Sequence, residues 1–381
     1  MKLVLTEEQQ FLKDTAQQFA REKTPVEHFR KLRDANDQQK WSQETWMEMV
    51  DLGWSSILIP EEYGGSEFGV SGLCVVLQEL GKTLTPSPLF ATGVLGVSAI
   101  NALGSDQQKK DLFKGILDGS ITTALAIDEK SHHQPFFNST IAKKDGDKYV
   151  INGKKIFVID GASASHIIVI ARTSGNEDDI EGLTAFIIPS DSPGMRISPL
   201  SLADSRNYAA VELDNLEVLA NSRLGEEGAA SGALESILDL GRIAIASEML
   251  GMTEEAFEIT NNYLKERKQF GVLIGSFQAL QHRAAKMFCE IELSKSTVLA
   301  AMFAADSNNN DLGRLASLAK FQVGETLHEV SNESVQMHGG IGVTDEYDIG
   351  LYLKRARVTE QIFGSADFHQ NRYAEIGRAH V

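Results

Sequence analysis

The chain has 381 residues, more than the roughly 100–200 that one domain usually contains. Hydrophobic residues make up 42% and charged residues 23%, which excludes wholesale disorder and fibrous repeats. Lys and Arg number 36 against 53 Asp and Glu, and the net charge of −17 would repel nucleic-acid phosphates and anionic membranes. We therefore expect a globular protein of two or three domains without a nucleic-acid partner.

Neither a secretory signal nor a membrane span is expected. Residues 1–8 become acidic and amphipathic without the apolar run of a signal peptide, and a cytoplasmic location follows as the expectation. The 23 residues 83–105 carry no charge, but prolines and glycines interrupt them. They predict a buried helix after a proline-containing turn.

The sequence contains no metal-binding or disulfide pattern. Cys74 and Cys289 are far apart in apolar surroundings, which predicts two buried thiols. His132 and His133 lie in a predicted loop without a matching carboxylate or cysteine ligand. We expect these two to be surface histidines and the metal content to be none.

Helical periodicity dominates residues 1–120, which predicts an N-terminal all-α domain. Between Thr6 and Lys23 apolar residues recur at helical spacing, with Thr6 as the N-cap. Glycine and proline signals separate further helices. These are expected at residues 46–52, 72–80, 89–103 and 107–117.

Short β-branched and apolar runs follow in residues 121–228, which predict a middle antiparallel β domain. The runs lie at residues 122–127, 149–152, 156–159, 166–171, 183–188 and 209–213. Asn152-Gly153 stands between two of them and is typical of a type I′ hairpin turn.

Three long helices are predicted in residues 229–375, which form a C-terminal helical bundle. They span residues 231–267, 277–305 and 311–337, and Gly339-Gly340 stops the last. Residues 376–381 do not continue the pattern and are expected to be a tail of cloning origin. The fold class is α+β.

Four motifs in order along the chain resemble the acyl-CoA dehydrogenase family. They are PEEYGG at 60–65, YVINGKK at 149–155, YLKERKQFG at 263–271 with FQALQH at 277–282, and QMHGGIG at 336–342. The resemblance implies an N-terminal helical domain, a middle β domain and a C-terminal four-helix bundle. It also implies an oligomer that binds one FAD per subunit.

The resemblance assigns six residues to the ADP half of the FAD of a neighbouring subunit. A buried pyrophosphate needs a fixed cation and oriented donors, and glycines permit close approach of the backbone. The six are Arg267, Phe270, Gln278, Gln336, Gly339 and Gly340. Asp239 and Arg242 match family positions near the CoA thioester and its pantetheine arm, although alone they are equally consistent with an ion pair on a helix surface.

The chain departs from the family at the catalytic base. The family removes the proton α to the thioester with a glutamate, and Phe363 stands at that position here. Some relatives carry the glutamate on the long helix instead, where this chain has Gly241. Glu360 is the nearest other carboxylate, since a residue three positions earlier lies on roughly the same helix face.

The expected flavin pocket departs as well. Asp128 stands where a neutral donor is usual, and Phe157 stands where a tryptophan packs on the isoalloxazine. Ile159 replaces a threonine that donates to flavin N5, and Ser365 is a further candidate beside Phe363. A carboxylate that faces a reduced, anionic flavin is unfavourable unless it is protonated or turned away.

We expect an FAD-dependent acyl-CoA dehydrogenase subunit of the base-lacking type found in heteromeric enzymes. The expected partners are an acyl-CoA substrate, a second family subunit or further copies of this chain, and an electron-transfer flavoprotein or similar acceptor. Three alternatives stay open: a self-sufficient dehydrogenase that uses Glu360, a flavin monooxygenase that needs no α-proton base, and a structural subunit without flavin. The sequence does not specify the acyl chain.

Overall fold

The computed structural model describes residues 4–35, 37–307 and 309–379. The chain divides into two compact units. The helical unit comprises residues 1–31, 70–85 and 242–381, and the sheet unit comprises residues 32–69 and 86–241. The helical unit thus joins segments from both ends of the chain. The domain boundaries expected after residues 120 and 228 stay predictions.

The first helices of the helical unit begin where the sequence places a cap. In α1 (Glu7–Lys23) Thr6 accepts a hydrogen bond from the Gln9 amide, and the Gln9 side chain accepts one from the Thr6 amide. A second helix, α2 (Val26–Asp34), was not predicted. In α4 (Val70–Lys82) the first two amides donate to Asp306, which caps the helix from a distant part of the chain.

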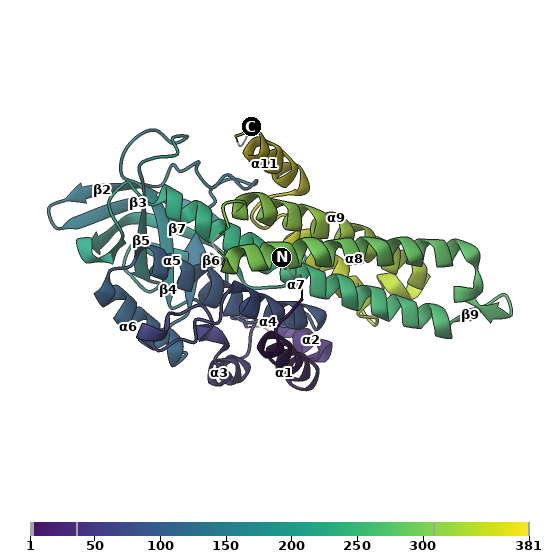
Figure 1. Cartoon of the computed structure of the whole chain (residues 1–381). Helices are drawn as coiled ribbons and strands as arrows, with labels where there is room; N and C mark the ends of the chain where they lie inside the picture. Colours follow the sequence, from purple (N-terminus) through teal and green to yellow (C-terminus); the bar gives the residue numbers. More distant parts are fainter. Residues whose placement is uncertain (1–3, 36, 308, 380–381) are drawn as a thin grey trace. The chain divides into compact units, whose positions relative to one another are not determined.

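Three long helices confirm the predicted bundle: α7 (Ser231–Glu266), α8 (Gln278–Asp306) and α9 (Leu312–His338). Helices α8 and α9 run side by side (Figure 1). A short hairpin of β9 (Lys268–Gln269) and β10 (Val272–Leu273) connects α7 to α8. Two shorter helices, α10 (Ile349–Thr359) and α11 (Ala366–Ala379), follow α9.

The predicted tail at 376–381 is described only in part. Helix α11 continues through residue 379, so the first four tail residues extend a helix. Residues 380 and 381 lie outside the described residues. The cloning origin of this tail stays a prediction.

Three α-helices lie wholly within the described part of the sheet unit, α3 (Gln43–Asp51), α5 (Val97–Leu103) and α6 (Asp106–Leu117). A π-helical segment, η3 (Phe90–Gly96), leads into α5, and both are largely buried, as predicted for this uncharged run. Across the part of the chain that the structure describes, no helix combines the length and apolarity required to cross a membrane.

The sheet has eight strands in the order β6-β7-β3-β2-β4-β5-β8, with β1 paired to β4. Their bounds are β1 (Thr123–Ala126), β2 (Ile141–Asp145), β3 (Lys148–Ile159), β4 (His166–Arg172), β5 (Leu183–Pro189), β6 (Met195–Pro199), β7 (Tyr208–Leu219) and β8 (Arg223–Leu224). Strand β1 runs parallel to β4, so the sheet is mixed, not wholly antiparallel as predicted. Parallel strands need a long connection, and here the chain passes through β2 and β3 between them.

The predicted hairpin turn at Asn152-Gly153 is wrong. Both residues lie inside the continuous strand β3, at a shift in its register with β7. A Cβ at Gly153 would lie 2.3 Å from the Thr140 hydroxyl oxygen, so glycine permits a close approach of another segment there. The tight turn is instead Gly146-Asp147, between β2 and β3.

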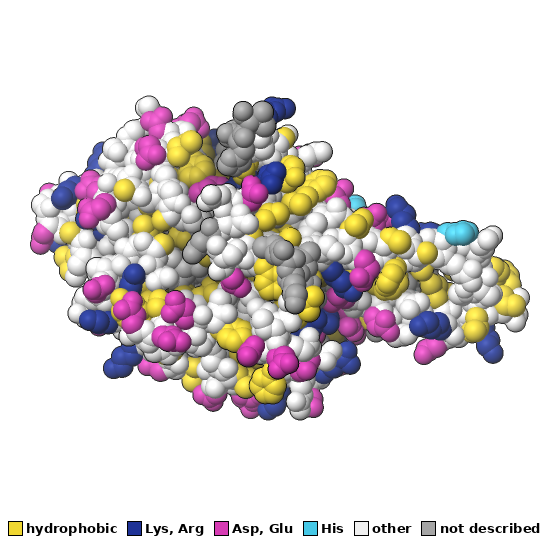
Figure 2. All heavy atoms as spheres, in the orientation of Figure 1, with side chains coloured by type: hydrophobic (Ala, Val, Ile, Leu, Met, Phe, Trp, Pro, Cys, Tyr) yellow, Lys and Arg dark blue, Asp and Glu magenta, His cyan; other side chains and the backbone are white. Residues whose placement is uncertain are grey.

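The prediction of two buried thiols is half wrong. Cys74 is buried in α4, and burial raises the pKa of its thiol to about 12. Cys289 is exposed on α8, and its apolar neighbours Phe288 and Leu293 are exposed as well. Figure 2 shows hydrophobic side chains on the surface of the helices near β9. An apolar sequence context therefore marked an exposed face rather than the core.

Candidate functional site

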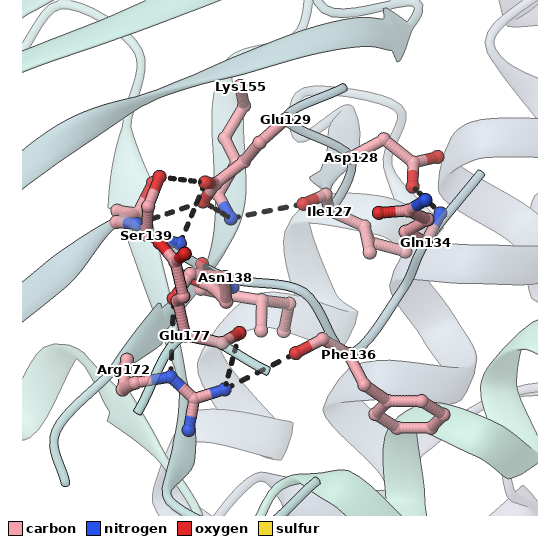
Figure 3. Close-up of polar contacts among 12 residues, drawn as sticks. Ile127, Asp128, Glu129, Gln134, Phe136, Asn138, Ser139, Lys155, Arg172 and Glu177 are labelled. Carbon is pink, nitrogen blue, oxygen red and sulfur yellow. Dashed lines mark hydrogen bonds and ion pairs between the residues drawn. The ribbon is translucent and has the colours of Figure 1, made fainter. Parts of the chain in front are cut away.

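A buried ion pair fixes the loop between β1 and β2 (Figure 3). Lys155 Nζ on β3 lies 2.7 Å from Glu129 Oε1 in the loop, with side chains 0% and 4% exposed. Glu129 also accepts hydrogen bonds from the amides of Ser139 and Thr140 at the end of the loop, and from the Ser139 hydroxyl. Burial raises the pKa of Glu129, but the Lys155 charge and these hydrogen bonds outweigh it and lower the pKa to about 2.

Arg172 on β4 is the second anchor of this loop (Figure 3). Its buried guanidinium donates to backbone carbonyls of the loop and of the β4–β5 connection. The acceptors are the carbonyl oxygens of Phe136 (3.3 Å), Asn138 (3.2 Å), Ser174 (3.2 Å), Glu177 (3.3 Å), Asp179 (2.7 Å) and Glu181 (2.7 Å). The backbone of the loop is therefore held in place by the protein itself.

Asp128 directly precedes Glu129, and its carboxylate is held within the loop. His133 Nδ1 lies 2.9 Å from Asp128 Oδ2, and the Gln134 amide donates to Oδ1 at 3.1 Å. The His133 side chain is only 2% exposed, so the prediction of two surface histidines without a carboxylate partner is wrong for His133. His132 is exposed, as predicted. Two positively polarised groups thus offset the charge of Asp128.

Phe157 lies next to Asp128 in a strained backbone conformation. The Ile156 amide donates to the Asp128 carbonyl at 2.8 Å, which brings the loop against β3. Phe157 follows with a φ of 53°, where the register with β7 shifts between Lys155 and Val158. Its ring is 41% exposed. A left-handed, exposed aromatic residue between paired segments is typical of a functional surface.

Ile159 ends β3 and is half-buried, two residues after Phe157. The structure therefore gathers three predicted flavin-side residues, Asp128, Phe157 and Ile159, at one end of β3. The fourth, Ser365, belongs to the helical unit. It directly precedes α11, and its hydroxyl accepts a hydrogen bond from the Phe368 amide at 3.4 Å.

Two buried cations hold the turn that carries Phe363. Arg242 Nε on α7 donates to the Phe363 carbonyl at 3.4 Å. Lys320 Nζ on α9 donates to the carbonyls of Glu360 at 3.1 Å and Gly364 at 3.4 Å. Burial lowers the pKa of Lys320 to about 7. Phe363 has a φ of 55° and is 7% exposed, so an apolar ring fills the position expected for the base.

The argument that placed Glu360 on the helix face of Phe363 is wrong. Helix α10 ends at Thr359, so Phe363 lies beyond it in a turn. The Glu360 carboxylate lies 2.7 and 2.9 Å from Arg357 Nη1 and 3.3 Å from His328 Nδ1. The Glu360 carboxylate is therefore already engaged by a guanidinium and an imidazole of the chain itself.

Asp239 and Arg242 are not a surface ion pair. Both are buried in α7, Arg242 completely. The Arg242 guanidinium also faces the ring of Phe368 at 5.6 Å. The interpretation that places them near a bound substrate therefore stays open, whereas the surface alternative does not.

The six residues predicted to bind nucleotide lie in the helical unit and are exposed. The side chains of Arg267, Gln278 and Gln336 have no hydrogen-bond partner within the described chain, so their donors are available. Cβ atoms at Gly339 and Gly340 would meet nothing within 4 Å, and Gly339 has a φ of 64°. Free donors beside open backbone fit the phosphates of a dinucleotide.

The ends of α7 and α9 meet in an aromatic cluster that the sequence analysis missed. The Tyr263 and His338 rings stack with centroids 4.3 Å apart, and Tyr347 lies 4.8 Å from His338. Arg267 lies one turn after Tyr263, and Gly339 directly follows His338. The stacking contact therefore brings Arg267 toward Gly339. Sequence spacing alone does not reveal such a contact. Lys320 was missed too, although a lysine within an apolar helical run is a signal for it.

Sequence profiles of one family match almost the whole chain. The profile of the acyl-CoA dehydrogenase N-terminal domain matches residues 6–120, that of the middle domain residues 127–216, and that of the C-terminal domain residues 231–377. The chain belongs to the acyl-CoA dehydrogenase family. It is therefore an oxidoreductase of a family that binds FAD, and the predicted fold class is confirmed.

Individual similar proteins and solved structures agree with this membership. "Probable acyl-CoA dehydrogenase YngJ" of Bacillus subtilis is 32% identical over 378 residues, covering 97% of this chain and 98% of that protein. Butyryl-CoA dehydrogenase from Megasphaera elsdenii superposes with a TM-score of 0.90 at 26% identity, covering 99% of each chain. The ChsE4-ChsE5 complex from Mycobacterium tuberculosis matches with a TM-score of 0.88 at 26% identity, covering 99% of this chain and 98% of that one.

Proposed function

We propose that this acyl-CoA dehydrogenase is a subunit of a heteromeric enzyme that desaturates an acyl-CoA thioester between its α- and β-carbons. The observation that carries the proposal is Phe363. Its buried ring occupies the position of the family glutamate, and Arg242 and Lys320 fix the turn that presents it. Gly241 leaves the alternative position without a carboxylate. The nearest remaining carboxylate, Glu360, is held by Arg357.

FAD is the proposed cofactor, and it accepts the hydride that leaves the β-carbon. The pyrophosphate and adenosine portions are held by Arg267, Gln278 and Gln336. At Gly339 and Gly340 the absence of a side chain lets these groups approach the backbone closely. Phe270, which is 91% exposed, offers an apolar face. In the family these residues serve the FAD of a neighbouring subunit, so this chain completes its partner's site.

Asp128, Phe157 and Ile159, all in the sheet unit, form the proposed isoalloxazine side, and Ser365 is a proposed cofactor contact by the family resemblance alone. Ile159 offers no hydroxyl donor, and Phe157 packs on the ring system. Asp128 is compatible with a reduced flavin because His133 and the Gln134 amide already bind its carboxylate. Asp239 and Arg242 are the proposed contacts of the thioester region.

A heteromeric assembly accounts for the apolar side chains that are exposed on α8. Phe288 and Leu293 on α8 are 52% and 56% exposed, and burial against another subunit would remove them from water. A solved relative, the ChsE4-ChsE5 complex, has a two-component name. We propose a glutamate-bearing family member as the second subunit and an electron-transfer flavoprotein or similar protein as the acceptor. The cytoplasmic location stays a prediction.

Assays with different electron acceptors distinguish an acyl-CoA dehydrogenase from a flavin monooxygenase. The complex of this chain with a glutamate-bearing family member should reduce a dye acceptor in proportion to added acyl-CoA. Oxygen consumption that depends on a flavin reductase, without acyl-CoA-dependent dye reduction, would instead identify a flavin monooxygenase. A complex in which this chain contributes to no flavin site would identify a structural subunit.

A further inference from the structure

Arg30 on α2 binds a distant segment of the chain, which follows the glycines of the proposed nucleotide site. Its Nε and Nη2 donate to Asp348 Oδ1 at 2.8 and 2.6 Å, across 318 positions of sequence. Its Nη1 donates to the Asp345 carbonyl at 2.7 Å. All three residues belong to the helical unit. One planar guanidinium therefore fixes this segment at two points, on either side of Tyr347.

Tyr347 packs against the aromatic cluster at the ends of α7 and α9. Its ring centroid lies 4.8 Å from that of His338 and 6.1 Å from that of Tyr263. The His338 ring is buried and stacks on Tyr263, whose hydroxyl donates to the His338 carbonyl at 3.4 Å. His338 Nδ1 donates to the Ser334 carbonyl at 2.7 Å. His338 is thus held by α7, by its own helix α9 and by Tyr347.

The glycines that follow His338 depend on their neighbours for their conformation. Gly339 has a φ of 64°, and Cβ atoms at Gly339 and Gly340 would meet nothing within 4 Å. Glycine loses more backbone freedom on ordering than any other residue, so contacts on both sides must supply the order. His338 supplies it on one side. On the other, only the short 3-10 helix η6 (Gly339–Val343) and Thr344 precede the segment that Arg30 binds.

We propose that Arg30 is a positioning residue of the cofactor site. By binding the 345–348 segment, it keeps Tyr347 against His338. This contact preserves the conformation of residues 339–340, whose open backbone receives the FAD phosphates. The inference rests on the proposed function, which assigns these glycines to FAD. A segment that is ordered in advance binds more tightly, because it loses less conformational entropy when the ligand arrives.

A direct electrostatic attraction between Arg30 and the FAD phosphates makes a different prediction. Arg30 and Asp348 carry opposite charges, so an electrostatic role would make their losses act on FAD affinity in opposite directions. A positioning role makes both losses weaken FAD binding, because either one breaks the same contact. The sign of the effect at Asp348 therefore separates the two.

Equilibrium binding of FAD to the flavin-stripped assembly that the full chain forms tests the inference, with quenching of flavin fluorescence as the readout. R30M and D348N should each weaken binding about tenfold, which corresponds to the entropy of ordering about one further residue. The double variant R30M/D348N should bind FAD no more weakly than either single variant, because all three lack one and the same contact. K31M is the matched control. It removes the same charge from the exposed neighbouring residue on α2, and its affinity should stay within about twofold of the wild type.

Thermal unfolding of the same flavin-free proteins measures any purely structural contribution of Arg30. A partly exposed ion pair contributes little to stability, so R30M and D348N should unfold close to the wild type while their FAD affinity falls. R30K keeps the charge but cannot reach both Asp348 and the Asp345 carbonyl with a planar fork, so it should also bind FAD more weakly. Loss of stability with unchanged FAD affinity would show a structural role only and overturn the proposal.

R267A separates the failure of this inference from failure of the proposed function. If R267A weakens FAD binding but R30M and D348N do not, the cofactor site stands and the positioning role of Arg30 is overturned. If R30M weakens binding while D348N strengthens it, Arg30 acts through its charge, and the positioning role is overturned as well. A wild type that binds no FAD, or an R267A variant that binds FAD as the wild type does, would overturn both the proposed cofactor site and this inference.

Discussion

Lys155 and Glu129 form an ion pair of 2.7 Å in which neither side chain is more than 4% exposed. Lys155 also donates to the Ile127 carbonyl at 3.0 Å, so one ammonium holds both the end of β1 and the loop that follows it. A buried pair of this kind contributes little net stability compared with apolar residues, but losing one partner is costly. Its main effect is to define the position of Asp128, which lies between Ile127 and Glu129.

We therefore expect E129Q to lower the free energy of unfolding by about 3 kcal/mol at pH 7, because it leaves the Lys155 ammonium buried without a counter-charge. The matched control is E212Q, which breaks the exposed pair of Glu212 with Lys154 and should change stability little. Urea denaturation measures both. Folding lowers the pKa of Glu129 from 4.5 to about 2, so the pair stabilises the protein above pH 4.5. The difference between wild type and E129Q should vanish as the pH falls toward 2.

The buried Lys320 predicts a second pH dependence of stability. Burial lowers its pKa from 10.5 to about 7 in the folded chain, so between these values the unfolded chain binds more protons. This group therefore makes stability rise with pH from about 7 to 10.5. K320M should abolish this rise of stability with pH, whereas K286M, which replaces an exposed lysine on α8, should retain it. Thermal unfolding at several pH values measures this pH dependence. If the stability of K320M and of the wild type changed with pH in the same way, the assignment to Lys320 would be contradicted.

R267A should weaken FAD retention strongly. Removal of a cation from a buried pyrophosphate costs on the order of 2–5 kcal/mol. H132A is the control, because the exposed His132 belongs to no proposed contact. Flavin absorbance after gel filtration reports retention. Equal flavin content in the two variants would show that Arg267 does not bind the cofactor.

The exposed face of α8 predicts association with other subunits. F288E replaces an exposed apolar ring near Cys289 and Leu293 with a charge, so it should dissociate the assembly that the wild type forms. Light scattering compares the masses of the two proteins. E292Q, a polar change on the same helix, is the control and should leave the mass unchanged. A monomeric wild type that retains FAD would contradict a flavin site shared between subunits.

The sequence predicted the features that local chemistry determines. Thr6 was predicted as the N-cap of the first helix, which the structure confirms, and the 3.6-residue period located α7, α8 and α9. The strand that contains Asn152 was predicted as two strands joined by a turn, because the dipeptide Asn-Gly is compatible both with a tight turn and with the close approach of another segment. Only the tertiary fold brings Thr140 against Gly153 and so distinguishes the two. The burial of His133 and the exposure of Cys289 were missed for the same reason. Both depend on which segments pack together, which one sequence does not reveal.

The position of Phe363 illustrates the limit for the site. Its identity at the base position could be read from the sequence, but the termination of α10 at Thr359 could not. That termination separates Glu360 from the Phe363 turn, and Arg357 then takes up the carboxylate. The structure thus weakens the one alternative base that the sequence offered.

Anaerobic reduction of bound flavin by acyl-CoA tests the central claim most directly. General-base catalysis supplies roughly 10²–10⁴-fold, so this chain alone should bleach its flavin at least about a hundredfold more slowly than the complex with a glutamate-bearing family member. E360Q should not change either rate, and F363E should accelerate the chain alone if its carboxylate ionises in that apolar surrounding. Rapid bleaching by the chain alone, at the rate of the complex and unchanged in E360Q, would contradict the account.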